Sequence, residues 1–138
     1  MTSFVSHCEQ DTIRFAADFA KKLKVGDIIA LHGTLGVGKT AFTRGVIQAL
    51  SGAKEVPSPT FTLLQTYETP DFDIYHFDMY RLKSPEEAYE IGIEDAFADG
   101  VSFIEWPEKI KGVLPRRHID IFFEINQNDR IITVKENI

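Results

Sequence analysis

The first half of the chain alternates between apolar patterns typical of helices and of strands. Apolar side chains recur at helical spacing within residues 11–23, which predicts a helix. The uninterrupted apolar run at residues 28–31 predicts a buried parallel strand, and residues 40–50 predict a second helix that ends near Gly52. A short strand is expected at residues 3–7. Strands and helices in this order predict a parallel sheet with helices on both faces.

The rest of the chain carries mainly strand patterns. Aromatic and β-branched residues fill positions 61–68 and 72–78, and the Thr-Pro-Asp between them predicts a hairpin. A second hairpin is predicted for residues 119–125 and 130–135, across a polar turn. Between the hairpins, the apolar residues 101–105 predict another buried strand.

The segment from Ser84 to Glu87 has the features of a helix start. Ser84 is a favourable N-cap, Pro85 suits the first helical position, and acidic residues follow in the first turn. No repeat, low-complexity tract or long linker interrupts the chain, so residues 1–138 are expected to form one domain. The expected fold class is α/β, with three layers and a mixed sheet that combines a parallel core with antiparallel hairpins.

Composition and charge exclude several classes of protein. With 138 residues, 43% of them hydrophobic and 26% charged, the chain resembles an ordinary soluble domain. The net charge of −6 argues against a protein that binds DNA or RNA by itself, and the densest basic cluster is only residues 116–118. No apolar run is long enough to cross a bilayer, and the first residues lack a secretory signal. Together with the single Cys8, this predicts a cytoplasmic protein.

The strongest chemical signal is a Gly-x4-Gly-Lys-Thr pattern formed by Gly33, Gly38, Lys39 and Thr40. Glycines let the backbone turn tightly and present its N–H groups to phosphate oxygens, and the helix that follows adds its positive end. Lys39 supplies a charge for the β- and γ-phosphates, and the Thr40 hydroxyl is a hard oxygen ligand for Mg²⁺. The residues expected to contact the nucleotide are Gly33, Leu35, Gly36, Val37, Gly38, Lys39, Thr40 and Ala41.

Two acidic residues at strand ends are candidates to complete such a site. Glu105 ends an apolar strand in the manner of a Walker B segment, and Asp78 ends the strand at 72–78. Each could instead be an ordinary surface carboxylate. The functional reading is favoured for Glu105, because burying an acid between Ile104 and Trp106 without a counter-charge would be costly. The pattern alone does not decide for Asp78, nor which carboxylate contacts the metal.

Weaker candidates surround these positions. Trp106 could stack on a base, although tryptophan is more often a core or rim residue, and His76 fits a hydrogen-bonded structural histidine better than a functional one. Arg81 suits either a γ-phosphate sensor or a surface ion pair. Ser58 and Thr60 occupy the interval where switch-type nucleotide enzymes sense the γ-phosphate, although the neighbouring prolines could simply shape a turn.

The nucleotide is expected to be ATP rather than GTP. GTPases recognise guanine with an Asn/Thr-Lys-x-Asp motif, which is absent from the chain. The nearest approach, residues 126–129, lacks the lysine and falls where a hairpin turn is predicted.

Several blocks of sequence, taken in order, resemble one family. They are residues 33–40, 42–45, 58–63, 76–82, 85–87 and 104–108. On these motifs the chain is similar to the TsaE (formerly YjeE) family of bacterial ATPases required for threonylcarbamoyladenosine modification of tRNA. The resemblance implies an atypical P-loop ATPase fold with interrupting β-hairpins, and ATP and Mg²⁺ as ligands. It also implies that the partners are the proteins TsaB and TsaD, that tRNA is reached only through their complex, and that neither DNA nor a membrane is bound.

The resemblance also implies roles for individual residues. It assigns Mg²⁺ binding to Thr40 and Glu105, a requirement in hydrolysis to Asp78, and switch behaviour to residues 58–60. It also supports Arg81 and His76 as sensor candidates, but less strongly than it supports Asp78. The chain departs from the family pattern at Thr34, where an acid is usual, and at Ala41, where a second threonine is common. Neither departure removes a phosphate or metal ligand.

Two other functions fit the same residues. The first is a small-molecule P-loop kinase, which needs an acceptor pocket and usually an arginine-rich lid. For that lid the chain offers only Arg116 and Arg117. The second is a nucleotide-gated binding module with negligible turnover.

Overall fold

A computed structural model of the protein describes residues 1–33, 38–57, 59 and 62–137. Its strands are β1 Thr2–Ser6, β2 Ile28–His32, β3 Leu64–Glu68, β4 Asp73–Asp78, β5 Gly100–Glu105, β6 Ile119–Asn126 and β7 Asp129–Glu136. Its helices are α1 Glu9–Ala20, α2 Lys39–Ser51, α3 Glu87–Glu90, α4 Ile93–Asp99 and the 3₁₀ helix η1 Pro107–Ile110. Five residues with predicted roles, Leu35, Gly36, Val37, Ser58 and Thr60, lie outside the described residues.

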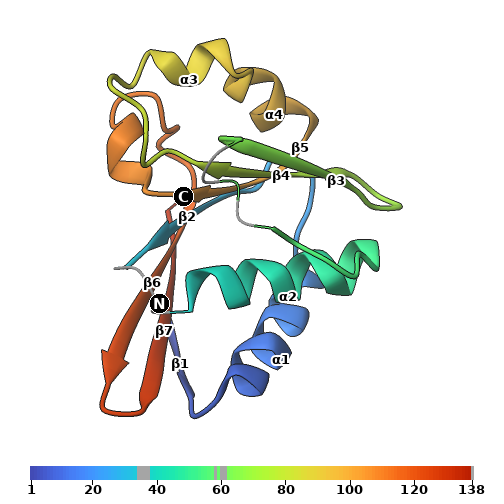
Figure 1. Cartoon of the computed structure of the whole chain (residues 1–138), viewed down its shortest axis with the longest axis vertical. Helices are drawn as coiled ribbons and strands as arrows, with labels where there is room; N and C mark the ends of the chain where they lie inside the picture. Colours follow the sequence, from blue (N-terminus) through green and yellow to red (C-terminus); the bar gives the residue numbers. More distant parts are fainter. Residues whose placement is uncertain (34–37, 58, 60–61, 138) are drawn as a thin grey trace.

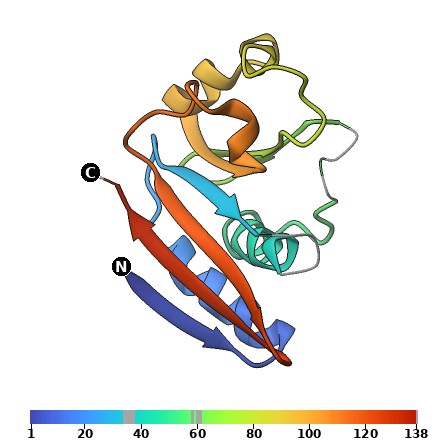
Figure 2. The same ribbon diagram turned by 90° about the vertical axis from the view of Figure 1, so that its left-hand side faces the viewer.

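The strands form one mixed sheet in the order β1-β7-β6-β2-β5-β4-β3. Its centre is parallel, because β2 pairs in parallel with both β5 and β6, and β4 pairs in parallel with β5. The outer pairs β1–β7, β6–β7 and β3–β4 are antiparallel. Both ends of the chain lie on the same side of the molecule, at the β1–β7 pair (Figure 2). The predicted mixed sheet with two hairpins is therefore confirmed.

Helices cover the sheet on both faces (Figure 1). Helices α1 and α2 pack against each other and against one face, where Ile29, Leu31 and Phe103 belong to their apolar core. Helices α3, α4 and η1 cover part of the other face, where Phe77 and Ile104 belong to a second core. Successive strand residues thus serve opposite layers, as the pleat of a sheet requires. The expected three-layer α/β fold is confirmed.

The contact between α1 and α2 is close because α2 contains a glycine. A Cβ atom added to Gly45 would lie 2.9 Å from the Cβ of Ala16 and 3.2 Å from the Cα of Ile13. Small residues on both helices therefore let the two backbones approach. This contact fixes the position of α2, whose first residues are Lys39 and Thr40.

The structure corrects one predicted helix start and adds two helices. Ser84 caps no helix with its side chain. The bonds from Ala88 N–H to the Pro85 carbonyl and from Tyr89 N–H to the Glu86 carbonyl span three residues, so 84–86 form turns and α3 begins at Glu87. Helices α4 and η1 had not been predicted. In the described part of the chain, no helix combines the length and apolarity needed to cross a membrane.

Candidate nucleotide site

The candidate site lies where three neighbouring parallel strands end. Strand β2 ends immediately before Gly33, β5 ends with Glu105 and β4 ends with Asp78. Glu105 and Asp78 are direct partners in the register of β4 and β5. Carboxyl ends of parallel strands share one edge of a sheet, the usual place for ligands in open α/β folds. The two acids predicted from separate strand ends are therefore neighbours.

The acids also share a face of the sheet. Ile74 on β4 and Phe103 on β5 both belong to the core beneath α1 and α2. Side chains two positions apart on a strand point to the same face, so Asp78 and Glu105 point to that side of the sheet. This is the side on which α2 begins. The arrangement brings the carboxylates and the start of the P-loop helix together.

Helix α2 begins in the manner that the P-loop pattern predicts. Its N-cap is Gly38, whose φ of 103° is a left-handed value that favours glycine, and the Gly38 carbonyl accepts from the Phe42 N–H at 3.0 Å. Among the described residues, no side chain caps the helix. The first N–H groups and the positive end of the helix dipole are thus available to an anion.

Lys39 is held in a buried position at the start of this helix. Only 4% of its surface is exposed, and its ammonium donates to the Gly33 carbonyl at 2.7 Å. The ammonium also lies 4.3 Å from the centre of the Trp106 ring. Burial lowers the pKa of Lys39 below its ordinary value of 10.5, and attraction to Glu105, Glu108 and Asp78 opposes part of that shift. Within the described residues Lys39 forms no ion pair, so its charge is available to an anionic ligand.

Glu105 is paired with a histidine from the neighbouring strand. The Nε2 atom of His76 lies 2.8 Å from Oε2 of Glu105, with 1% and 7% of the two side chains exposed. Asp78 is also buried, and its Oδ1 accepts from the backbone N–H of Tyr80 at 3.0 Å. Both carboxylates are thus oriented by hydrogen bonds at the edge of the site.

Trp106 follows Glu105 in an uncommon backbone conformation. Its φ of 59° is left-handed, which is rare for a large side chain and turns the chain sharply after β5. Its ring contacts that of Tyr80 at 4.9 Å between centroids, as well as Lys39. Trp106 therefore lies at the rim of the site. Arg81 is exposed in the turn after β4, and its predicted role as a sensor stays a prediction.

A cavity of about 370 Å³ adjoins the start of α2. Thr40, Ala41 and Arg44 line it from α2, together with residues from the start of α1 and from the β6–β7 turn, which include Cys8 and Arg130. Three of these lining residues are not predicted from the sequence to belong to the site: Cys8, Arg44 and Arg130. No local motif could have predicted them, because only the fold brings α1 and the β6–β7 turn to the P-loop helix.

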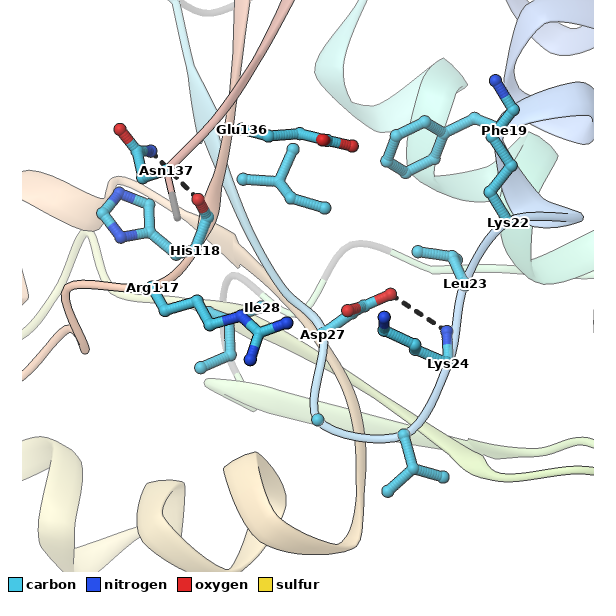
Figure 3. Close-up of a pocket in the computed structure, with 13 residues that line it drawn as sticks. Phe19, Lys22, Leu23, Lys24, Asp27, Ile28, Arg117, His118, Glu136 and Asn137 are labelled. Carbon is cyan, nitrogen blue, oxygen red and sulfur yellow. Dashed lines mark hydrogen bonds between the residues drawn. The ribbon is translucent and has the colours of Figure 1, made fainter.

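A second cavity, of about 320 Å³, lies at the opposite edge of the sheet (Figure 3). It is bounded by the amino ends of β2 and β6 and by the end of α1, and its lining includes Phe19, Lys24, Asp27, Arg117 and Glu136. Its charges are mixed, with acidic and basic side chains facing one another. Of the predicted site residues that the structure describes, none lines it. It is separate from the candidate nucleotide site.

The residues at the candidate site fit a nucleotide-bound magnesium ion. Thr40 supplies an exposed hydroxyl, and Asp78 and Glu105 supply carboxylates, all hard oxygen ligands. In the part of the chain that the structure describes, no three His, Cys, Asp or Glu side chains converge on one point. A metal ion here would therefore need oxygens from a ligand, as Mg²⁺ does when it is bound through phosphates.

Comparison with known proteins identifies relatives over most of the chain. The sequence model of the family described as "Threonylcarbamoyl adenosine biosynthesis protein TsaE" matches residues 6–132. The tRNA threonylcarbamoyladenosine biosynthesis protein TsaE of Rickettsia bellii is 47% identical over 127 residues, which cover 91% of this chain and 88% of the relative. The protein of the same name from Haemophilus influenzae is 36% identical and covers 94% of each chain.

A solved structure agrees with the fold. The crystal structure of YdiB from Bacillus subtilis superposes with a TM-score of 0.83 at 28% sequence identity. The match covers 99% of this chain and 85% of that chain. The overall fold is therefore shared with a protein whose structure has been determined.

Proposed function

Because the chain belongs to the TsaE family, we propose that it is a P-loop ATPase of tRNA threonylcarbamoyladenosine biosynthesis. The observation that carries this proposal is the position of Lys39. Its ammonium is buried without an ion pair in the described residues, close enough to Asp78 and Glu105 to be attracted by their charges. Such a charge favours the arrival of an anion, and the free start of α2 favours a phosphate.

Each residue of the site has a role in this proposal. Gly33, Gly38 and the first turn of α2 bind the phosphates through backbone N–H groups, and Lys39 leaves the Gly33 carbonyl to bind the β- and γ-phosphates. Thr40 and Glu105 hold Mg²⁺, which when bound neutralises charge on the phosphates. Asp78 orients the attacking water. These roles make Lys39, Asp78 and Glu105 the catalytic residues.

The cavity beside α2 accommodates the nucleoside part of ATP in this proposal. It is continuous with the start of the P-loop helix, since Gly38, Thr40 and Ala41 line it. Its volume of about 370 Å³ lies in the range of small-ligand pockets. Arg44 and Arg130 also line the cavity. Arg44 is paired with Glu9, which lines the same cavity, so the charge of Arg130 remains as the net positive charge of the lining.

We further propose that the protein acts in the cytoplasm with TsaB and TsaD. Its ATPase cycle then drives the transferase complex, and tRNA is contacted by the partners. The net charge of −6 supports this division, because a protein that grips RNA alone usually carries a basic surface.

Nucleotide binding is tested with a pair of lysine variants. Lys39→Met is expected to weaken ATP binding at least about 100-fold by calorimetry, because a buried charge on the phosphates is lost. Lys54→Met, at an exposed position beyond the end of α2, is the control and is expected to bind normally. Equal affinities for the two variants would contradict the proposal.

The products of the reaction with ATP distinguish the proposed ATPase from a small-molecule kinase and from a nucleotide-gated binding module. Phosphate released from ATP without any added acceptor, and faster with TsaB and TsaD present, excludes a small-molecule kinase. A nucleotide-gated module would be favoured if Glu105→Gln bound ATP, released no phosphate and still supported tRNA modification. In the proposed ATPase that variant binds ATP but stops modification.

A further inference from the structure

His76 is a costly residue for the place that it occupies. It shares its face of β4 with Ile74, in the core beneath α1 and α2, and 1% of its surface is exposed. Its Nδ1 atom is buried and has no hydrogen-bond partner among the described residues. A buried polar atom without a partner destabilises a fold, whereas an apolar residue here would avoid that cost. Packing alone therefore does not explain a histidine at this position.

The other ring nitrogen makes one directed contact. Nε2 lies 2.8 Å from Oε2 of Glu105, across the parallel β4–β5 pair. A carboxylate can only accept, so Nε2 carries the proton and donates it. The register places His76 opposite Phe103, two residues before Glu105, and both side chains of the pair point to the same face. The backbone of two strands therefore fixes the direction of this hydrogen bond.

We propose that His76 is a positioning residue that orients the Glu105 carboxylate for metal binding. By occupying Oε2, it leaves Oε1 as the oxygen available to the metal. His76 acts only through Glu105, because it is buried and its single donor is already used. The inference rests on the proposed ATPase function, in which Glu105 holds Mg²⁺.

Substitutions at His76 separate the donor from the volume of the side chain. His76→Leu removes the Nε2–H donor and is expected to lower phosphate release by about 10- to 100-fold, the usual effect of losing a residue that orients a metal ligand. His76→Gln can place an amide N–H near the original Nε2 position and is expected to recover most of that loss. His76→Asn has a shorter amide and is expected to recover little.

Nucleotide affinity with and without Mg²⁺ tests the metal site directly, without a measurement of activity. Without Mg²⁺, wild type and His76→Leu are expected to bind ADP equally, because Lys39 and the start of α2 are unchanged. With Mg²⁺, the gain in affinity for a non-hydrolysable ATP analogue is expected to shrink in His76→Leu and to return in His76→Gln. The control is His118→Leu, which removes a histidine paired with Asp120 at 3.1 Å elsewhere on the sheet.

A double-mutant cycle with Glu105→Gln decides the proposal. Because Glu105→Gln is expected to release no phosphate, the cycle is measured as the Mg²⁺-dependent gain in affinity for the ATP analogue. If His76 acts through Glu105, His76→Leu causes no further loss of that gain once Glu105 is replaced. Independent effects that multiply would overturn the inference and leave the ATPase proposal standing. Unchanged hydrolysis in Glu105→Gln alone would instead overturn the assigned role of Glu105 and the inference with it. If His76→Leu fails to fold, the Gln and Asn variants give the same comparison.

Discussion

At the scale of single residues, the contacts of Lys39 determine how the site can bind an anionic ligand. Its ammonium is bound to the Gly33 carbonyl at 2.7 Å and lies over the Trp106 ring at 4.3 Å. Both contacts are weaker than a hydrogen bond from the ammonium to a phosphate oxygen, in which donor and acceptor are both charged. In the proposed function, phosphate binding exchanges these two contacts for stronger ones, with the lysine already positioned before the nucleotide arrives.

Cys8 offers a direct test of where the nucleoside binds. It is exposed, it is the single cysteine of the chain, and it lines the cavity beside Thr40 and Ala41. Saturating ATP with Mg²⁺ is expected to slow its alkylation by N-ethylmaleimide about 10-fold or more, because the ligand blocks access to the thiol. Mass spectrometry of the labelled protein over time gives the rate.

The control moves the thiol to another exposed position. In a Cys8→Ser/Ala49→Cys variant, the new thiol lies near the far end of α2 and is expected to react at the same rate with and without nucleotide. An unprotected Cys8 at saturating ATP would place the nucleoside outside this cavity.

Individual site residues could be predicted from the sequence where a short motif or a strand end indicates a specific chemical role. The places of Gly38, Lys39 and Thr40 at the start of α2, and of Asp78 and Glu105 at strand ends, were predictable from the sequence, although the pattern left the role of Asp78 open. The His76–Glu105 hydrogen bond could not be predicted, because it joins residues 29 positions apart and depends on the register of two strands. The same holds for Cys8 and Arg130, which reach the site only through the packing of other elements.

The packing of α1 against α2 governs the site at the scale of secondary-structure elements. Alanine normally favours a helix over glycine by about 1 kcal/mol, yet Gly45→Ala places a Cβ 2.9 Å from that of Ala16. We expect the steric effect to dominate and to destabilise the protein by about 1–3 kcal/mol. Thermal or urea unfolding measures the change.

The control for Gly45→Ala is a second substitution that removes the steric clash with Ala16. Adding Ala16→Gly removes one of the two colliding Cβ atoms and is expected to restore part of the stability, although the contact with the Ile13 backbone remains. A stabilised Gly45→Ala variant would show that the helices separate without cost.

Element prediction succeeded where periodicity and turn residues agreed. The hairpin of β6 and β7 and the buried strands β2 and β5 were found for that reason. Residues 84–99 were predicted poorly because short helices bury few residues, so their apolar pattern has too few repeats to be distinctive. Their position against Phe77 and Ile104 comes from tertiary packing.

At the scale of the whole molecule, hydrogen bonds to Asp120 connect parts of the chain that are far apart in the sequence. It accepts hydrogen bonds from His32 on β2 at 2.7 Å and from Asn137 after β7 at 2.8 Å, and it lies 3.1 Å from His118. Burial raises its pKa, but these hydrogen bonds and the nearby histidines lower it by more, so the pKa falls below its ordinary value of 3.8. The folded carboxyl therefore binds a proton less readily than the unfolded one.

This shift gives a prediction for acid stability. The stability that Asp120 contributes is present above about pH 4 and is lost as the pH falls through its lowered folded-state pKa. Asp120→Asn is expected to be less stable near neutral pH by on the order of 1 kcal/mol, and to lose less stability between about pH 5 and pH 2. Urea unfolding at a series of pH values tests both. Asp18→Asn, at an exposed position on α1, is the control, and an acid slope for Asp120→Asn equal to that of wild type would contradict the prediction.

The central claim concerns ATP turnover at the edge formed by β2, β5 and β4. The most direct measurement is phosphate release from ATP with Mg²⁺, with and without TsaB and TsaD, in wild type and Glu105→Gln, alongside ATP binding by each. We predict release that needs Mg²⁺, increases with the partners and is lost in Glu105→Gln while ATP binding persists. Absence of release from the wild type with partners present, or equal release from the two proteins, would contradict it.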